Sequence, residues 1–374
     1  MDLRGAECRL AASTQSGANP VKTNNSARMQ DVADLLGVHR TTVSLALRAH
    51  PSIPEKTRAA VRRAAAKLGY RPNPLVAALM SFRRSPRTAP RHTTLAYITA
   101  TQPPNAWRQS KTFRSQFAGA CERAREEGFN VEEFSLYSKG MTPERLNEVL
   151  RSRGILGLIV APLVNGETTL PLAWDEFAAV GVAFTLQRPN VPRLGNDHSQ
   201  SVRLAIQECR RRGYRRIGLA IRRMQIERVE EQWLAGYLVE HTFPKTVAHP
   251  PPLIADEWEE NIFNAWFRSA RPDVVLTGGD PESVIAWLRR AGHEVPADVG
   301  VASLDLHERD GAFAGIDQHS EQIGAMVAET LIARLRRNER GALDQPVRTH
   351  LMGEWVDGAS VRKLASADSR NTLR

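Results

Sequence analysis

The sequence predicts an N-terminal all-α head followed by an α/β core of two doubly wound parallel-sheet lobes. The excess positive charge is confined to residues 1–91, which hold 16 Lys or Arg against 5 Asp or Glu, whereas the remaining residues hold 35 against 36. This basic segment shows helical spacing of apolar residues, and from Thr93 onward short apolar runs alternate with amphipathic stretches. At 374 residues, the chain is long enough for two or three domains.

Composition is that of a folded protein without a membrane span, since 42% of residues are hydrophobic and 25% are charged. The longest apolar run, 155–164, has ten residues, about half of what a bilayer crossing needs. Residues 1–20 lack an apolar stretch of secretory length, so we expect a cytoplasmic protein. No disulfide framework is expected, because no C-x-x-C pair or zinc spacing occurs among Cys8, Cys121 and Cys209.

Residues 1–27 show no periodicity, and we expect a disordered N-terminal extension there. Two short helices are expected after it, because apolar residues recur at helical spacing on either side of an interruption at Gly37 and Val38. These apolar residues are Val32, Ala33, Leu35 and Leu36 before the interruption, and Val43, Ala46 and Leu47 after it.

A third helix is expected after a loop that contains prolines. Ser52 and Glu55 have the S-x-x-E spacing of a capping box, and Pro54 suits the first turn. Gly69 suits a left-handed helix end. The apolar stripe of this helix comprises Ala60, Val61, Ala64, Ala65 and Leu68. Three helices that share an apolar face predict a small folded head at 28–70.

This head resembles the DNA-binding head of LacI-type transcription regulators. The resemblance rests on MQDVADLLGVHRTTVSLAL at 29–47 and LGYRPNPLVAALMS at 68–81, with the D-V-A, G-V and T-V-S motifs in order. It implies a helix-turn-helix, whose second helix enters the major groove of double-stranded DNA. A generic three-helix bundle is the alternative.

The resemblance implies that Arg40 and Thr41 read bases, Arg40 by pairing with guanine O6 and N7, and Thr41 by a hydrogen bond or by placing its methyl group against thymine. Thr42 and Ser44 are suited to phosphates. Two residues depart from the family: His39 replaces a Ser cap and is a weaker cap that donates instead to phosphate or base, and Leu45 replaces a frequent Arg, which leaves apolar contact or plain packing. The expected DNA contacts are His39, Arg40, Thr41, Thr42, Ser44, Leu45, Arg48, Tyr70, Asn73 and Leu79.

Residues 71–92 are expected to form a hinge helix and an exposed linker. The helical part, 75–80, is too short to be stable alone, because nucleation costs outweigh so few hydrogen bonds. The resemblance implies that it folds when paired with its twin on operator DNA, where Leu79 wedges into the minor groove. Packing of Leu79 on the core is the alternative.

The core is expected to alternate strands and helices, a pattern typical of parallel, doubly wound sheets. The expected strands are 95–99, 128–134, 156–160, 182–186, 217–221, 274–276 and 299–304. The expected helices are 113–127, 144–151, 200–212, 227–240, 257–267, 281–291 and 321–337. This number of strands predicts two sheets.

The core resembles, more weakly, the periplasmic-binding-protein-type core of the same family, in LGNDHSQSVRLAIQECRRRGYRRIGLAI, W-L-A-G-Y and RPDVVLTGGD. This implies two lobes, about 93–190 with 320–340 and about 191–319 with the C-terminal segment, which close around a small carbohydrate-like molecule. Loops after strands are where such ligands bind, and an aromatic side chain can stack on a sugar. The expected effector-binding residues are Trp107, Asp197, Arg222, Asp280 and Asp305, with helix caps and solvated ion pairs as the alternative roles.

The sequence lacks the motifs of phosphate-binding loops, dinucleotide sites, serine hydrolases and zinc proteases, so we expect no enzyme, no cofactor and no metal site. The predicted protein is a homodimeric transcription regulator, more often a repressor in this family, that binds a palindromic operator. An effector bound in the core at 93–360 would modulate its DNA affinity. The alternative is a DNA-binding regulator whose core only dimerises. Residues 361–374 are expected to be a disordered tail.

Overall fold

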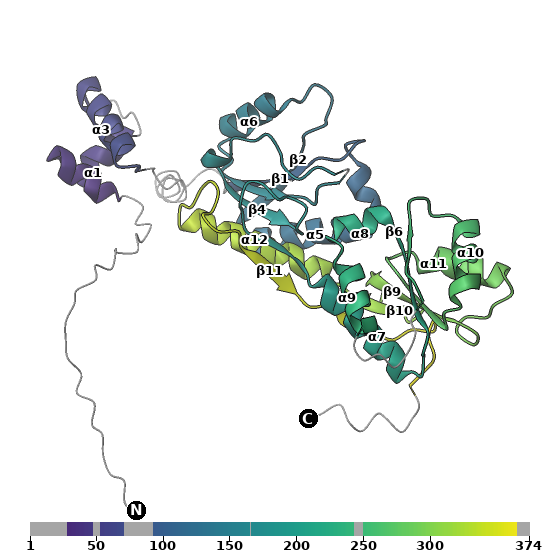
Figure 1. Cartoon of the computed structure of the whole chain (residues 1–374). Helices are drawn as coiled ribbons and strands as arrows, with labels where there is room; N and C mark the ends of the chain where they lie inside the picture. Colours follow the sequence, from purple (N-terminus) through teal and green to yellow (C-terminus); the bar gives the residue numbers. More distant parts are fainter. Residues whose placement is uncertain (1–27, 48–52, 71–92, 165, 243–249, 365–374) are drawn as a thin grey trace, which may run out of the picture. The chain divides into compact units, whose positions relative to one another are not determined.

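The computed structural model describes residues 28–47, 53–70, 93–164, 166–242 and 250–364. The chain divides into two compact units, a helical head and an α/β core (Figure 1). Three predicted segments, the extension at 1–27, the hinge and linker at 71–92 and most of the C-terminal tail, lie outside the described residues.

The head contains three short helices, α1 (Met29–Leu36), α2 (Arg40–Leu47) and α3 (Glu55–Lys67), as the sequence predicts. Gly37 ends α1 with a positive φ of 63°, which lets the chain turn sharply toward α2. Pro54 is the N-cap of α3 rather than a first-turn residue, and Ser52 lies outside the described residues. The buried core of the head consists of Val32, Ala33, Val43, Ala46, Val61, Ala64 and Ala65.

The core contains two six-stranded sheets, which confirms the predicted pair of α/β lobes. The first sheet has the order β11-β5-β4-β3-β1-β2, and all its pairs are parallel. The second has the order β12-β10-β9-β8-β6-β7, with only the β10–β12 pair antiparallel. The strands are β1 (Thr93–Thr99), β2 (Phe129–Ser135), β3 (Gly157–Val160), β4 (Ala178–Val182), β5 (Arg193–Asn196), β6 (Ile217–Arg222), β7 (Leu253–Ala255), β8 (Val274–Thr277), β9 (Gly300–Leu306), β10 (Ala314–Asp317), β11 (Arg348–Leu351) and β12 (Glu354–Val356).

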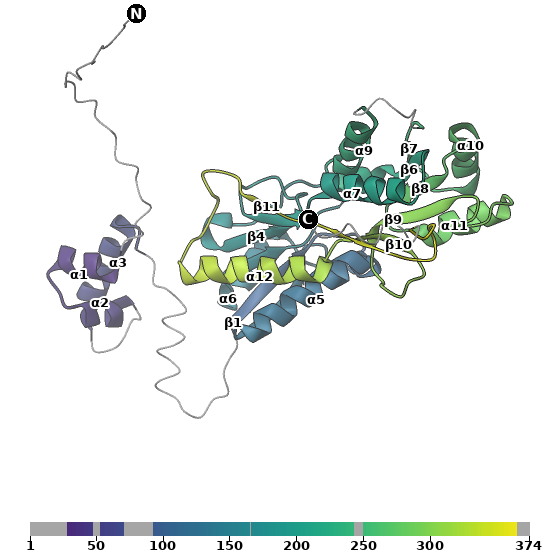
Figure 2. The same cartoon turned by 90° about the horizontal axis from the view of Figure 1, so that it is seen from below.

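Helices cover both sheets (Figures 1 and 2). They are η1 (Ala106–Gln109), α5 (Lys111–Glu126), α6 (Pro143–Ser152), η2 (Trp174–Glu176), α7 (His198–Arg211), α8 (Arg223–Arg228), α9 (Gln232–Thr242), α10 (Glu260–Ala270), α11 (Pro281–Arg290) and α12 (Ser320–Arg336). Within the described ranges, no helix has the length and apolarity that a bilayer crossing requires.

Two expected elements are wrong in position or length. The strand expected at 182–186 is β4, four residues earlier, because the chain turns at Ala183, whose φ is 57°. The helix expected at 227–240 is two helices, α8 and α9. Glu230 and Glu231 separate them with φ values of 50° and 54°, and Glu230 makes an ion pair with Arg348 of β11.

The lobe boundary also differs from the expected one, because β5 completes the first sheet instead of starting the second lobe. The C-terminal segment is likewise divided, with β11 in the first sheet and β12 in the second. The chain therefore crosses between lobes three times, near residues 196–197, 317–320 and 351–354.

Helices α5 and α12 of the first lobe lie side by side (Figure 2). Their close approach depends on two glycines: a Cβ added at Gly119 would lie 1.9 Å from the Glu321 carbonyl oxygen, and one at Gly324 would lie 1.9 Å from that of Gln116. This packing fixes α5, whose first turn reaches the second lobe.

Candidate nucleic-acid interface and interlobe cavity

The N-terminal end of α2 presents exposed polar side chains. Val43 and Ala46 are buried in the head core, whereas His39, Arg40 and Thr41 are exposed. The apolar residues of α2 recur at helical spacing, so they lie on one face of the helix and are buried there. The polar residues lie on the opposite face, which is exposed. An exposed face on the second helix of a helix-turn-helix is available to enter the major groove.

The ring of His39 caps α2. Its Nδ1 lies 2.8 Å from Thr41 Oγ1 and accepts a longer hydrogen bond, 3.4 Å, from the backbone N–H of Thr41. The His39 carbonyl oxygen accepts from the backbone N–H groups of Thr42 and Val43. The imidazole thus takes the place of the family's Ser cap, and its role toward phosphate or base stays a prediction.

The other predicted DNA contacts are only partly described. Thr42, Ser44 and Leu45 are half-buried, and Leu45 does not join the apolar cluster of the head. Tyr70 packs against that cluster, and burial raises the pKa of its phenol, an effect that the nearby Arg40 guanidinium opposes. Three residues lie outside the described part of the chain, namely Arg48, Asn73 and Leu79.

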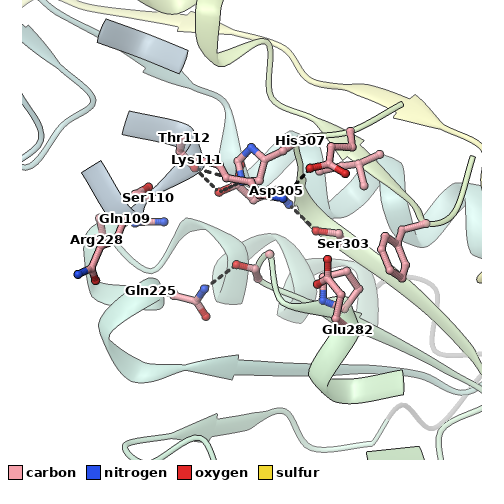
Figure 3. Close-up of a pocket in the computed structure, with 16 residues that line it drawn as sticks. Gln109, Ser110, Lys111, Thr112, Gln225, Arg228, Glu282, Ser303, Asp305 and His307 are labelled. Carbon is pink, nitrogen blue, oxygen red and sulfur yellow. Dashed lines mark hydrogen bonds and ion pairs between the residues drawn. The ribbon is translucent and has the colours of Figure 1, made fainter. Parts of the chain in front are cut away.

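A polar cavity of about 320 Å³ lies between the two lobes (Figure 3). The end of η1 and the first turn of α5 line it from the first lobe. The turn after β8, the end of β9 and helix α8, which follows β6, line it from the second. Its lining includes Lys111, Thr112, Arg228, Gly279, Asp305 and Glu308.

A smaller chamber adjoins this cavity and shares Thr112, Arg228 and Asp305 with it. Its walls hold buried polar atoms without a hydrogen-bond partner among the described residues. These atoms are Gln116 Oε1, His198 Nδ1, Trp233 Nε1, Asp305 Oδ1 and Gln318 Oε1. Since buried polar groups normally find partners, a set of donors and acceptors left open in one place suits a polar ligand.

Direct contacts between the lobes lie beside the cavity and the chamber. Asp305 Oδ2 accepts a 2.8 Å hydrogen bond from the Thr112 hydroxyl, and Lys111 Nζ lies 2.7 Å from Glu308 Oε1. The Arg228 guanidinium carbon lies 5.3 Å from the centre of the Phe113 ring, within range of a cation–π contact. Burial lowers the pKa of Arg228, which Asp305 partly offsets.

His198 lies on the chamber wall at the start of α7. Its ring meets that of Trp233 edge-on, with centroids 5.3 Å apart. Burial lowers its pKa to about 4, so the imidazole is neutral at pH 7 and can donate or accept a hydrogen bond.

Of the five predicted effector residues, the structure brings only Asp305 to the cavity. Trp107 is buried in the first lobe, and its Nε1 donates a 2.6 Å hydrogen bond to Glu133. Asp197 caps α7 by accepting from the N–H of Gln200. The remaining two residues, Asp280 and Arg222, form an ion pair, and Asp280 also caps α11.

Sequence reasoning missed Thr112, Arg228 and His198. Arg228 follows β6 and precedes W-L-A-G-Y, so the rule that ligands bind after strands was the available signal. Thr112 and His198 carry no such signal, because helix starts are commonly polar. No cluster of three metal-liganding side chains occurs within the described residues.

The family assignment follows from two matches. Residues 28–73 match the family model "Bacterial regulatory proteins, lacI family", and residues 206–361 match the model of the periplasmic binding protein-like domain. The head belongs to the lacI family of bacterial regulatory proteins. This LacI-family protein is a transcription regulator that binds DNA through its helix-turn-helix head.

The relatives of this LacI-family chain are regulators as well. It is 25% identical to the HTH-type transcriptional regulator CelR of Thermobifida fusca over 349 residues, 87% of this chain and 96% of that protein. It shares its fold with a CelR–cellobiose complex, at 22% identity and a TM-score of 0.55, over 89% of this chain and 99% of that one. It also resembles the lac repressor dimer bound to operator and the anti-inducer ONPF, at 18% identity and a TM-score of 0.55, over 91% and 100%.

Proposed function

We propose that this regulator is a homodimeric repressor whose affinity for a palindromic operator is modulated by a carbohydrate-like effector. The proposal of an effector rests on the buried polar atoms of the interlobe chamber that have no hydrogen-bond partner among the described residues. These atoms include both donors and acceptors. A sugar hydroxyl both donates and accepts, so a polyhydroxylated molecule matches such a mixed set. The relatives described with cellobiose and with operator DNA support the same class of function.

Regulation would follow from closure of the lobes. A ligand that touches both lobes binds the closed arrangement better than an open one, and it therefore shifts the population toward closure. The coupling to DNA is reciprocal: the operator must alter effector affinity by the same factor. We propose that the protein acts in the cytoplasm, where bacterial DNA is found, and that it catalyses no reaction.

Two measurements test this function. Footprinting on the DNA upstream of the protein's own gene should show protection of a palindrome. Thermal melting with a panel of sugars should identify the effector, since a ligand at one hundred times its Kd adds about 2.7 kcal/mol of stability. The effector should then change operator affinity. If the protein binds its operator but no ligand stabilises it, the result supports the alternative, a DNA-binding regulator whose core only dimerises.

Deletion of residues 1–91 separates the two functions. The remaining core should lose operator binding and still be stabilised by the effector, because the cavity is built entirely from the core. Operator binding by this truncated core would contradict the assignment of DNA recognition to the head.

A further inference from the structure

The contact between His39 and Thr41 fixes the direction of a hydrogen bond. The backbone N–H of Thr41 can only donate, so Nδ1 of His39, 3.4 Å away, is an acceptor and carries no proton. The same Nδ1 lies 2.8 Å from Thr41 Oγ1, and the hydroxyl must therefore donate to it. The proton of the neutral ring is then on Nε2.

This arrangement leaves Thr41 with lone pairs only for an outside partner. A threonine hydroxyl has one proton and two lone pairs, and His39 holds the proton. Both side chains are exposed at the end of α2 that a helix-turn-helix inserts into the major groove. Any base that Thr41 meets there must supply the hydrogen.

We infer, resting on the proposed function, that Thr41 reads a base that presents an amino group in the major groove, and that His39 imposes this choice by holding the hydroxyl proton of Thr41. Adenine N6 and cytosine N4 are the amino donors in that groove. Guanine and the O4 atom of thymine offer acceptors there, so reading them would require Thr41 to break its bond with His39. His39 is thus a positioning residue that selects two bases of four.

Selection of bound duplexes from a randomised library by the full-length protein tests the assignment. The base pair whose preference changes in Thr41→Val is the one that Thr41 reads, because this change removes the hydroxyl and keeps the shape. The wild type should prefer adenine or cytosine at that position. In Thr41→Val the ratio of affinities for the preferred base and the other bases should fall about 2- to 10-fold. Thr41→Ser, which keeps the hydroxyl, should retain it.

Preference for guanine or thymine at that position would overturn the inference, and so would a Thr41→Val variant that changes no position. A wild-type protein that selects no sequence would instead refute the proposed function. The two failures are therefore distinguishable.

Two substitutions of His39 test the positioning role. His39→Asn puts an acceptor oxygen on Cγ, where Nδ1 stands, and should keep the preference for adenine or cytosine. His39→Ser can still cap the helix, but its shorter side chain leaves the Thr41 hydroxyl free to donate, so guanine and thymine should become acceptable. Both variants lose the Nε2 proton, so a general fall in affinity is common to them. Unchanged base preference in His39→Ser, or lost preference in His39→Asn, would contradict the role of His39.

Discussion

The hydroxyl of Thr112, in the first turn of α5, donates a 2.8 Å hydrogen bond across the lobes to Oδ2 of Asp305 in β9. The other oxygen of this carboxylate, Oδ1, is buried and has no hydrogen-bond partner in the described part of the chain. Asp305 therefore bonds to the first lobe through one oxygen, and under the proposed function its second oxygen accepts a hydrogen bond from the effector.

Asp305→Asn should weaken binding of the effector found by thermal melting. A hydrogen bond to a charged group contributes about 1.5–3 kcal/mol, so the Kd should rise about 10-fold or more in calorimetric titration. Asp256→Asn is the matched control, because Asp256 is exposed in the second lobe, pairs with Arg223 and lines neither the cavity nor the chamber. Equal Kd values for the two variants would show that Asp305 does not touch the ligand.

His198 should make the core less stable in acid. Its folded pKa, about 4, is below the unfolded value of about 6.5, so the unfolded chain binds the extra proton between these values. Stability should therefore fall as the pH drops from about 6.5 toward 4, by at most about 2 kcal/mol at pH 5.

Urea unfolding of the full chain at pH 7.5 and pH 5 measures this loss for the core transition. His198→Gln removes the titrating ring and should show a smaller difference between the two pH values than the wild type. Asp305, Arg228, Asp197 and His350 act on the same ring and remain in the variant, so the comparison isolates His198. Identical pH dependence in both proteins would contradict a depressed pKa.

Helices and strands are predicted well from the sequence where their buried apolar residues recur at a regular spacing. Val32, Ala33 and Val43 recur at helical spacing, and they form the head core. Strand β5 was missed because Arg-Leu-Gly-Asn is no apolar run: Arg193 is buried there, and its guanidinium donates to the Leu186 carbonyl oxygen. The cavity is harder to predict from the sequence than the strands are. Two of its lining residues, Thr112 and Asp305, are 193 residues apart and meet only when the two lobes come together.

Gly119→Ala should destabilise the first lobe. Alanine favours a helix by about 1 kcal/mol over glycine, so propensity alone would stabilise α5. The added Cβ would lie 1.9 Å from the Glu321 carbonyl oxygen in α12, and such overpacking costs about 1–3 kcal/mol. The free energy of unfolding, measured in urea, should therefore fall, whereas the control Ala118→Gly, at an exposed site of α5, should lose only the propensity difference. A more stable Gly119→Ala protein would mean that α5 and α12 are not packed so closely.

Arg40→Ala and Arg62→Ala should have different effects on operator binding, although each removes one exposed positive charge from the head. Arg62 already bonds to Glu55, at 2.5 Å, whereas Arg40 is the first residue of α2 and forms no ion pair within the described residues. A bidentate contact of Arg40 to guanine contributes about 1–3 kcal/mol of discrimination. Arg40→Ala should thus relax preference at one base pair, while Arg62→Ala should lower affinity slightly and equally for all sequences. Fluorescence anisotropy measures the affinity of each variant for the operator and for single-base variants of it. If Arg40→Ala lowers the affinity equally for all these sequences, Arg40 contacts phosphate and does not read a base.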